Sequence, residues 1–581
     1  MKKRFFSTSM VLVIIAACLC GAALAVYRAY FMPNNKVVPA FSEAGLNVVV
    51  EGDAVRGKGE PKVIDGRVLL PLDIVKDYID PQINWDSKLH KLTITTADRV
   101  VRMKTDSLEA FVNNKPVTLN IPVSEAGGSV LVPIEFLSEY YNIGISYIED
   151  NSVVVVDFKS RAGQLAEPLS EKAVVRNGRS ILNPILKRLD SENADENKLR
   201  VYGEFDKWYK VRTSDGMVGY IEKKYVTVRP LPPEKAPAAE ESKPAWTPQT
   251  GKLSMAWDYA YDMKINLSKR QKIDGLDIIS PTWFQVVGED GAIKNSADAA
   301  YVEWAHKNGY QVWALFSNSF GDPEKSGSFL RNTDSRDNAI RQLLAFTSLY
   351  KVDGINIDFE NLLDSDKAAL TQFVRELAPL LREQGMIVSA DVNTLPCYDR
   401  KALGEAVDFI MLMAYDQHWA GGSEAGSVAE LDWADRTVKN FLNTIPAQKL
   451  ILGIPFYTRL WKEEPGEDGK IKLTSQALSM SAIDKIIKDN KAAVSWNETS
   501  GQFYSEYTKG GATYRVWLED VNSVNLRTSL VHKYGLAGAA AWRLDFEQPS
   551  VWPLITGNLK TIKSYSEWEN LNKGKIHVFA N

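Results

Sequence analysis

Residues 252–560 alternate between short runs that favour strands and longer runs that favour helices. The strand-like runs are apolar and cover residues 253–257, 276–283, 311–316, 352–359, 386–392, 409–415, 449–456 and 538–542. Helical patterns lie between most of them, at residues 334–350, 365–384, 428–442 and 521–534. Eight strands in this alternation predict a closed (β/α)8 TIM barrel, because an open doubly wound sheet usually has fewer strands. Chemistry in such barrels takes place at the carboxyl ends of the strands.

The fourth strand-like run carries polar groups where a buried strand should be apolar. It reads Asp-Gly-Ile-Asn-Ile-Asp-Phe-Glu over residues 353–360. Because strand side chains alternate between two faces, Asn356, Asp358 and Glu360 share one face of the strand. Buried carboxylates are costly to desolvate, so this face predicts a reaction site, with a buried ion-pair network as the alternative. Asp353 is out of phase with that face and is predicted to form structural hydrogen bonds near the start of the strand.

Further polar and aromatic residues stand where the other barrel strands are expected to end. They are Asp258, Trp283, Asn318, Asp391, Asn393, Tyr415, Asp416, Tyr457, Trp542 and Asp545. The carboxyl ends of parallel strands meet at one rim of a barrel, so we expect these side chains to lie around Glu360. Aromatic residues also fill barrel cores, and core packing is an equal alternative for Trp283, Trp313 and Trp419.

Several of these segments resemble the family-18 glycoside hydrolases. The run DGINIDFE is similar to the fourth-strand signature of that family, and residues 413–416 (MAYD) are similar to its sixth-strand motif. Residues 453–457 (GIPFY) and 541–542 (AW) resemble its seventh and eighth strands. Residues 461–522 resemble its small α+β insertion between strands seven and eight. The resemblance covers most of residues 251–560, with several independent motifs in the expected order.

The resemblance implies a role for each candidate residue. Glu360 is expected to donate a proton to the leaving glycosidic oxygen, and the charge of Asp358 is expected to raise the pKa of Glu360. The substrate's own 2-acetamido oxygen is the expected nucleophile, with Asp358 orienting the acetamido N–H and Tyr415 donating to the carbonyl oxygen. Trp542 is expected beneath the reacting sugar. Substrate-binding residues are expected to be Asn356, Asp416, Trp542, Asp391, Trp283 and Tyr457.

Asn356 departs from the commoner form of the fourth-strand motif, DxxDxDxE, which has an aspartate at this position. The amide can still hydrogen-bond Asp358, but it cannot share a proton or add charge. We therefore expect a pH profile displaced from that of relatives that carry the aspartate. The sequence NIDFE is similar to the branch that includes spore cortex-lytic N-acetylglucosaminidases, which favours peptidoglycan over chitin as the substrate.

The N-terminal segment predicts export. Lys2, Lys3 and Arg4 precede an apolar run over residues 10–26, and we assign residues 1–31 to a signal peptide or membrane anchor. Three fates are open for this segment: cleavage after residues 23–25, lipidation at Cys18, or retention as an anchor. Retention is favoured because the apolar run is long for a signal peptide. All three fates place the remaining chain on the extracytoplasmic face of the cell envelope.

Residues 36–158 contain an internal repeat with an offset of 62 residues, from position 66 to position 128. Residues 66–72 (GRVLLPL) align with residues 128–134 (GSVLVPI) without a gap. Each copy predicts a strand, a helix that follows a proline, and two further strands. This pattern resembles the α+β stalk domain named after the N-terminal domain of copper amine oxidases. It contains no metal-ligand cluster, so a spacer or weak wall-binding module is favoured.

Residues 165–229 predict a hairpin, because two alternating runs flank the Asp215-Gly216 turn. This segment resembles a small bacterial SH3-like β-barrel, whose usual ligands are wall peptides or polysaccharide. Residues 230–250 are rich in proline and predict a stiff linker. Residues 561–581 are expected to form a C-terminal tail.

Composition excludes other classes of protein. The formal net charge is −4 with dispersed lysine and arginine, so nucleic acid is not an expected partner. The three cysteines and five histidines suggest no disulfide framework, metal site or cofactor. We therefore expect an exported retaining β-N-acetylglucosaminidase that acts on a GlcNAc-containing wall polymer, peptidoglycan or spore cortex. The alternatives are a chitinase and a non-catalytic glycan-binding barrel.

Overall fold

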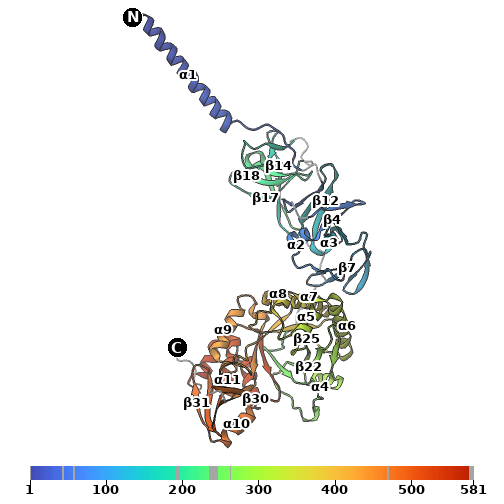
Figure 1. The fold of residues 1–581 in the computed structure, drawn as a ribbon, viewed down its shortest axis with the longest axis vertical. Helices are drawn as coiled ribbons and strands as arrows, with labels where there is room; N and C mark the ends of the chain where they lie inside the picture. The colour runs from blue at the N-terminus through green and yellow to red at the C-terminus, as the bar shows by residue number, and fades with distance from the viewer. Residues whose placement is uncertain are drawn as a thin grey trace. The chain divides into compact units, whose positions relative to one another are not determined.

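The computed structural model describes residues 2–41, 45–55, 59–189, 197–234, 246–261, 263–466 and 470–574. Its ribbon is shown in Figure 1. The chain divides into two compact units: the first comprises Met1–Trp85, His90–Ile94 and Val101–Glu241, and the second comprises Asp86–Leu89, Thr95–Val100 and Ser242–Asn581. Most of the predicted proline-rich linker, residues 235–245, and the last seven residues, 575–581, lie outside the described residues.

The N-terminal segment forms one long helix, α1 (Lys2–Tyr30). Its apolar part, Met10–Arg28, is 19 residues long with a mean hydropathy of 2.6, which is long and apolar enough to cross a membrane. A signal sequence has the same length and composition. The helix therefore agrees with the predicted export, and retention as an anchor stays a prediction.

The repeat folds as predicted. In the first copy β4 (Arg67–Pro71) leads into α2 (Leu72–Tyr78), and in the second copy β11 (Ser129–Pro133) leads into α3 (Ile134–Tyr141). The two leading strands pair antiparallel, with Leu70 opposite Val132. Each helix begins directly after a proline: Pro71 and Pro133 end the leading strands with ψ angles of 136° and 105°. The strands that follow are β5 (Asn84–Asp86) and β6 (Lys91–Thr95), and then β12 (Ile143–Ile148) and β13 (Val153–Phe158).

The remaining strands of this region complete three small sheets. They are β1 (Asn47–Val50), β2 (Asp53–Val55), β3 (Lys62–Ile64), β7 (Val100–Lys104), β8 (Glu109–Val112), β9 (Lys115–Thr118) and β10 (Ser124–Ala126). The sheet orders are β12-β13-β1-β2, β10-β11-β4-β3 and β5-β6-β7-β8-β9. Valine, leucine and isoleucine side chains from all three sheets share one buried core.

Residues 163–231 form a seven-stranded antiparallel sheet with the order β16-β15-β19-β18-β17-β14-β20. Its strands are β14 (Gly163–Pro168), β15 (Val174–Arg176), β16 (Ile185–Arg188), β17 (Leu199–Glu204), β18 (Trp208–Arg212), β19 (Val218–Glu222) and β20 (Val226–Leu231). The predicted hairpin is confirmed: β18 and β19 pair with Val211 opposite Gly219, and Gly216 turns between them with a φ of 88°. The assignment to the SH3-like class stays a prediction.

The second unit contains the predicted eight-stranded parallel barrel. Its strands are β21 (Leu253–Asp258), β22 (Ile278–Val286), β24 (Gln311–Ser317), β25 (Gly354–Asp358), β26 (Ile387–Val392), β27 (Phe409–Met413), β28 (Leu450–Pro455) and β34 (Gly538–Trp542). Each pairs with its neighbours, and β21 pairs with both β34 and β22, so the sheet closes. A short strand β23 (Ile293–Asn295) extends β22 as a hairpin.

Helices cover the outside of this barrel (Figure 1). They are α4 (Ala299–Lys307), α5 (Pro323–Arg331), α6 (Thr333–Tyr350), α7 (Lys367–Glu383), α8 (Arg400–Ala406), α9 (Leu431–Phe441), α11 (Val521–Lys533), α12 (Val551–Thr556) and α13 (Tyr565–Asn572). One apolar cluster fills the barrel and includes Trp257, Trp313 and Met411. A larger cluster lies between the strands and the helices. These two layers follow from strand side chains that alternate between the two faces of a closed sheet.

The predicted C-terminal tail includes helix α13, which packs on the barrel. Trp568 is fully buried, and its indole Nε1 donates to Asn525 Oδ1 of α11 at 2.9 Å. The segment from 564 to 574 is therefore part of the folded domain.

A small antiparallel sheet is inserted between β28 and β34. It comprises β29 (Tyr457–Pro465), β30 (Ile471–Ser479), β31 (Ala493–Asn497), β32 (Gln502–Lys509) and β33 (Ala512–Leu518), with the order β30-β29-β33-β32-β31 and helix α10 (Met480–Asp489). The sheet starts at Tyr457, four residues before the predicted start of the insertion at residue 461. Tyr457 is therefore the first residue of the inserted sheet, directly beyond the seventh barrel strand.

Candidate active site

Glu360 and Asp358 lie at the carboxyl end of β25. The strand pairs with β24 as far as Asp358, which is opposite Ser317, so Glu360 follows the last paired residue. Asp358 is buried, with 5% of its surface exposed, and Glu360 is half-buried. Burial, and then the negative charge of Asp416, raises the pKa of Glu360 to about 7. A raised pKa was predicted, but its cause differs: Asp416 contributes the charge that we expected from Asp358.

Asn318 fixes the backbone at Glu360. Its Nδ2 donates to the Glu360 carbonyl oxygen at 2.8 Å, and its Oδ1 accepts from the Glu360 N–H at 2.9 Å. The Tyr398 hydroxyl donates to the carbonyl oxygen of Phe359 at 2.7 Å. Three hydrogen bonds therefore hold the chain where it leaves the strand, which limits the positions that the Glu360 carboxyl can take.

Replacing Asn318 with alanine tests whether its two hydrogen bonds position Glu360. We expect Asn318→Ala to lower kcat by about 10- to 100-fold, because a small displacement of a proton donor has a large effect on rate. The loss of two hydrogen bonds to a partly buried backbone is expected to lower the free energy of unfolding by about 2 kcal/mol. Steady-state kinetics and urea unfolding measure the two effects. An unchanged kcat in a folded variant would contradict the role of Asn318 in positioning Glu360.

Asn356 is fully buried and forms hydrogen bonds inside the barrel. Its Oδ1 accepts from Trp257 Nε1 at 2.8 Å and from Ser280 Oγ at 3.4 Å. Its Nδ2 donates to Asp391 Oδ1 at 2.7 Å and to Ser389 Oγ at 3.1 Å. The prediction that Asn356 hydrogen-bonds Asp358 is wrong, because the Asn356 amide donates to residues of β26 instead. With no exposed surface and four internal partners, Asn356 is placed as a support for the site and not at a sugar-contacting position.

Tyr415, Asp416 and Tyr457 lie together beyond the ends of β27 and β28. The rings of Tyr415 and Tyr457 pack edge to face at 6.4 Å, and the Tyr457 hydroxyl donates to Asp416 Oδ1. Arg459 Nη2 lies 3.7 Å from the same Asp416 oxygen. Burial raises the pKa of Tyr415 well above its ordinary value, with further contributions from Asp391 and Glu360. Tyr415 therefore stays a hydroxyl donor near three acidic groups.

The aromatic candidates occupy different layers of the barrel. Trp542 is half-buried at the end of β34 and packs edge to face on Trp257 at 5.9 Å. Trp283, in contrast, is 2% exposed and packs on Tyr301 at 5.2 Å in the cluster between strands and helices. The structure therefore brings Trp542 to the rim, whereas it places Trp283 in the outer core. The pairing of β22 with β24 is irregular between Thr282 and Phe284, and Trp283 and its neighbour Phe284 both lie in this outer cluster.

Asp391, at the end of β26, is 3% exposed. Together with Asp358 and Glu360 it forms the acidic group of the site. Burial raises its pKa well above the ordinary value, Glu360 raises it further, and the hydrogen bond from Asn356 lowers it in part. Asp353, at the other end of β25, accepts from the Val312 N–H and lies 2.8 Å from His306 Nε2. The structural role predicted for Asp353 is confirmed.

Two tyrosines near the acidic group were not predicted. Tyr261 follows β21 and its hydroxyl donates to Ser317 Oγ at 3.2 Å, and Tyr398 lies beyond β26. Burial raises the pKa of both hydroxyls, and the charges of Asp358 and Glu360 raise them further. Both residues lie in irregular segments, where no periodic pattern indicates which way a side chain points.

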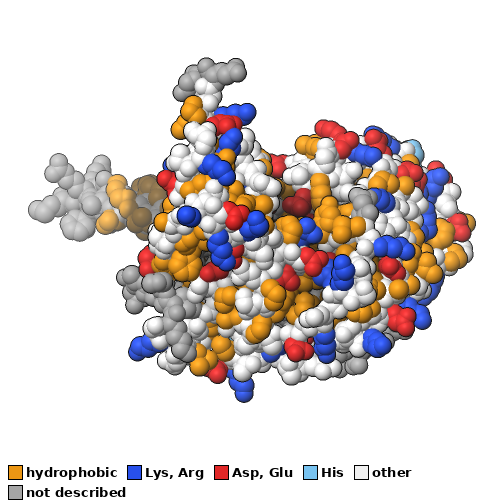
Figure 2. Space-filling model, turned by 90° about the horizontal axis from the view of Figure 1, so that it is seen from below, with side chains coloured by type: hydrophobic (Ala, Val, Ile, Leu, Met, Phe, Trp, Pro, Cys, Tyr) orange, Lys and Arg blue, Asp and Glu red, His pale blue; other side chains and the backbone are white. Residues whose placement is uncertain are grey.

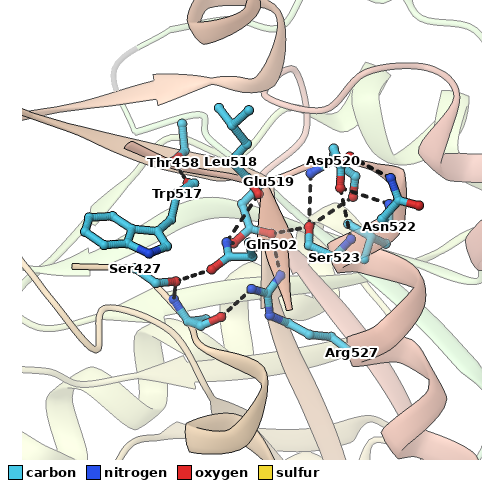
Figure 3. Close-up of polar contacts among 12 residues, drawn as sticks. Ser427, Thr458, Gln502, Trp517, Leu518, Glu519, Asp520, Asn522, Ser523 and Arg527 are labelled. Carbon is cyan, nitrogen blue, oxygen red and sulfur yellow. Dashed lines mark hydrogen bonds and ion pairs between the residues drawn. The ribbon is translucent and has the colours of Figure 1, made fainter. Parts of the chain in front are cut away.

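A second polar network joins the inserted sheet to the barrel, as Figure 3 shows. Glu519 and Arg527 form a buried ion pair, and Glu519 also accepts from Gln502 Nε2 and Ser523 Oγ, each at 2.8 Å. Gln502 accepts from the Ser427 hydroxyl, and Arg527 donates to the Ala429 carbonyl oxygen. Burial, which Arg527 opposes, raises the pKa of Glu519 to about 7. The network fixes residues 427–429 of the segment that follows Asp416.

Charge is mixed on the face of the molecule that Figure 2 draws. Over the described part of the face drawn in Figure 2, acidic and basic side chains are interspersed with apolar ones. Among the described residues, no group of three or more His, Cys, Asp or Glu side chains could hold a metal ion. Inside the barrel, Asp358, Glu360 and Asp391 form a cluster of carboxyl groups that influence one another, and Asp416 acts on Glu360 from beside it. This arrangement can supply a proton from Glu360 and accept a hydrogen bond at Asp358.

Comparison with known proteins agrees with this geometry. Residues 285–547 match the family model for glycosyl hydrolases family 18, and residues 49–156 match the model for the copper amine oxidase N-terminal domain. The uncharacterized glycosylase YvbX of Bacillus subtilis is 27% identical over 288 residues, which is 47% of this chain and 82% of YvbX. The cortical fragment-lytic enzyme of Bacillus subtilis is 24% identical over 261 residues, 43% of this chain and 59% of that enzyme.

Among solved structures, the spore cortex-lytic enzyme SleL of Bacillus megaterium is 21% identical with a TM-score of 0.48. The match covers 59% of this chain and 77% of SleL. The chain thus spans most of YvbX but less than two thirds of the cortical fragment-lytic enzyme of Bacillus subtilis.

Proposed function

Because the chain carries a family-18 glycosyl hydrolase domain, and is therefore a glycoside hydrolase, we propose that it cleaves β-N-acetylglucosaminyl bonds in a cell-wall glycan. Glu360 donates the proton to the leaving oxygen, and the substrate's acetamido oxygen attacks the anomeric carbon with retention of configuration. Asp358 accepts from the acetamido N–H, and Tyr415 donates to the acetamido oxygen. Asp416, Tyr457 and Trp542 contact the sugar.

One observation carries this proposal: Glu360 is a half-buried carboxyl with a pKa raised to about 7, next to the buried Asp358. A general acid works best when its pKa lies near the working pH, because it then carries a proton and also releases it readily. A glycan-binding barrel without activity has no need of such a proton donor. This comparison favours catalysis over binding alone.

The substrate is proposed to be peptidoglycan or spore cortex. The NIDFE segment around Asn356 and the similarity to a cortical fragment-lytic enzyme support this choice. The apolar helix α1 supports export, and the repeat domain and the seven-stranded sheet are proposed to act as spacers or wall-binding modules. Chitin oligosaccharides are the second candidate, because they contain the same N-acetylglucosaminyl bond.

An assay on three substrates separates these candidates. Full-length protein is incubated with peptidoglycan, with cortex fragments and with chitin oligosaccharides, and mass spectrometry identifies the new reducing ends. We expect N-acetylglucosamine at the reducing ends released from peptidoglycan or cortex. Faster release from chitin oligosaccharides would favour a chitinase, and binding without any release would favour a glycan-binding barrel.

The pH dependence of kcat/KM tests the state of Glu360. Glu360 acts in its protonated form, so activity is expected to fall as the pH rises through about 7, the pKa of the free enzyme. Asp416→Asn removes a negative charge that raises this pKa, so the basic limb should move to lower pH. Asp432→Asn, at an exposed position on α9, is the matched control and should leave the pH of the basic limb unchanged. A basic limb that does not move in Asp416→Asn would contradict the assigned cause.

A further inference from the structure

Asp358 and Asp391 occupy the same level of two neighbouring strands. In the pairing of β25 with β26, Asn356 is opposite Ser389 and Ile357 is opposite Ala390, so Asp358 and Asp391 are the next positions. Register-matched residues on parallel strands point to the same face, and the strands are about 4.8 Å apart. Both side chains are more than nine-tenths buried. The two carboxyl groups are therefore close neighbours inside the barrel.

These two carboxyl groups lack a balancing positive charge. Within the described part of the chain, Asp358, Glu360 and Asp391 form no ion pair with lysine, arginine or histidine. Asp358 Oδ1 is buried without a hydrogen-bond partner. Two ionised carboxylates at this separation and burial repel strongly, and one of them binds a proton instead. Asp358 Oδ1, which has no hydrogen-bond partner, is an oxygen to which that proton can bind.

We propose that Asp391 is the proton partner of Asp358: the pair holds one proton, and Asp391 accepts it when the substrate's acetamido N–H donates to Asp358. The O–H bond on Asp358 breaks, an O–H bond forms on Asp391, and the negative charge moves to Asp358. Asp391 on β26 thus supplies the carboxyl group that is missing from position 356 on β25, where the chain has an asparagine. This inference rests on the proposed function, and Asp391 is a positioning residue in it.

The surroundings of the pair support a shared proton. Asn356 donates to Asp391 Oδ1 at 2.7 Å, which orients the carboxyl and leaves Oδ2 to carry the proton. The titratable groups that face the pair are Glu360, Tyr261, Tyr398 and Tyr415. The three tyrosines are neutral hydroxyls at neutral pH, and Glu360 adds negative charge when it ionises. Burial and the neighbouring carboxyls raise the pKa of Asp358 well above its ordinary value, in agreement with this arrangement.

The test exchanges the two positions. Asp391→Asn keeps the shape and the hydrogen bond to Asn356 but removes the proton acceptor. The double variant Asn356→Asp/Asp391→Asn moves the acceptor to β25 and keeps a hydrogen bond between the two residues. We expect Asp391→Asn to lower kcat by at least about tenfold with little change in KM and a displaced pH profile. The double variant should recover most of the lost kcat and the wild-type profile.

A second measurement does not depend on activity. Infrared difference spectra at pH 7.5 detect buried protonated carboxyl groups, and a Glu360→Gln background removes the signal of the proton donor. We expect the C=O band of the protonated Asp358 to shift in frequency in Asp391→Asn, because its neighbour changes from a carboxylate to an amide, and to return to its wild-type position in the double variant. If the band does not shift in Asp391→Asn, or if that variant keeps full kcat and the wild-type profile, the shared proton is overturned. A band that behaves as expected in a protein with no glycosidase activity would overturn the proposed function alone.

Discussion

Glu360→Gln is expected to lower kcat by about 10³-fold on every substrate that the wild-type protein cleaves, because the amide cannot donate the proton that the leaving oxygen needs. Glutamine has the shape of glutamate, and the two hydrogen bonds from Asn318 are made to the backbone of residue 360, so the substitution leaves them in place. Binding of the glycan is therefore expected to persist. Initial rates at saturating substrate measure kcat, and calorimetric titration with an oligosaccharide measures binding.

The matched control for this variant is Glu303→Gln on the exposed surface of α4, which should leave kcat unchanged. The free energy of unfolding of Glu360→Gln should stay within about 1 kcal/mol of wild type. A folded Glu360→Gln protein that keeps more than about a tenth of the wild-type kcat would exclude Glu360 as the principal proton donor.

Arg527→Met is expected to lower the free energy of unfolding of the barrel domain by about 3–5 kcal/mol. The substitution leaves the fully buried Glu519 without its counter-charge, and it removes the donor to the Ala429 carbonyl oxygen. The buried Glu519 carboxyl must then either stay charged without a partner or bind a proton, and both cost free energy that the ion pair avoids. Urea unfolding followed by tryptophan fluorescence measures the change.

Two further variants separate charge from packing. Arg341→Met removes an exposed arginine from α6 and is expected to change stability by less than about 0.5 kcal/mol. Arg527→Met/Glu519→Leu removes both charges, and most of the lost stability should return because no buried charge remains. A double variant as unstable as Arg527→Met would mean that packing of the arginine, and not the unpaired charge, causes the loss.

The barrel was predictable because its signal is repeated along the chain. The predicted eighth strand, 538–542, has the same bounds as β34, and the helix predicted at 521–534 agrees with α11 to within one residue. Alternation within residues 353–360 also separated Asn356 and Asp358 from the residues that face outward. A short periodic pattern therefore identified the strand that carries the acidic group.

The partners of these residues were not predictable, because they depend on register between strands. The hydrogen bond from Asn356 to Asp391 requires β25 and β26 to align at Asn356 and Ser389, which no pattern within either strand specifies. The source of the raised pKa of Glu360 likewise depends on where Asp416 lies after β27. Trp283 shows a different limit: the strand pairing is irregular between Thr282 and Phe284, so Trp283 and Phe284 both lie in the outer core, which regular alternation does not predict.

The anomeric configuration of the first product tests the central claim most directly. Full-length protein is added to a chitin oligosaccharide or to a peptidoglycan fragment, and proton NMR records the new reducing end before it mutarotates. Attack by the substrate's own acetamido oxygen, followed by water, retains configuration, so the β-anomer of N-acetylglucosamine should form first. First formation of the α-anomer would mean that water attacks directly, and it would contradict the roles proposed for Glu360 and Asp358.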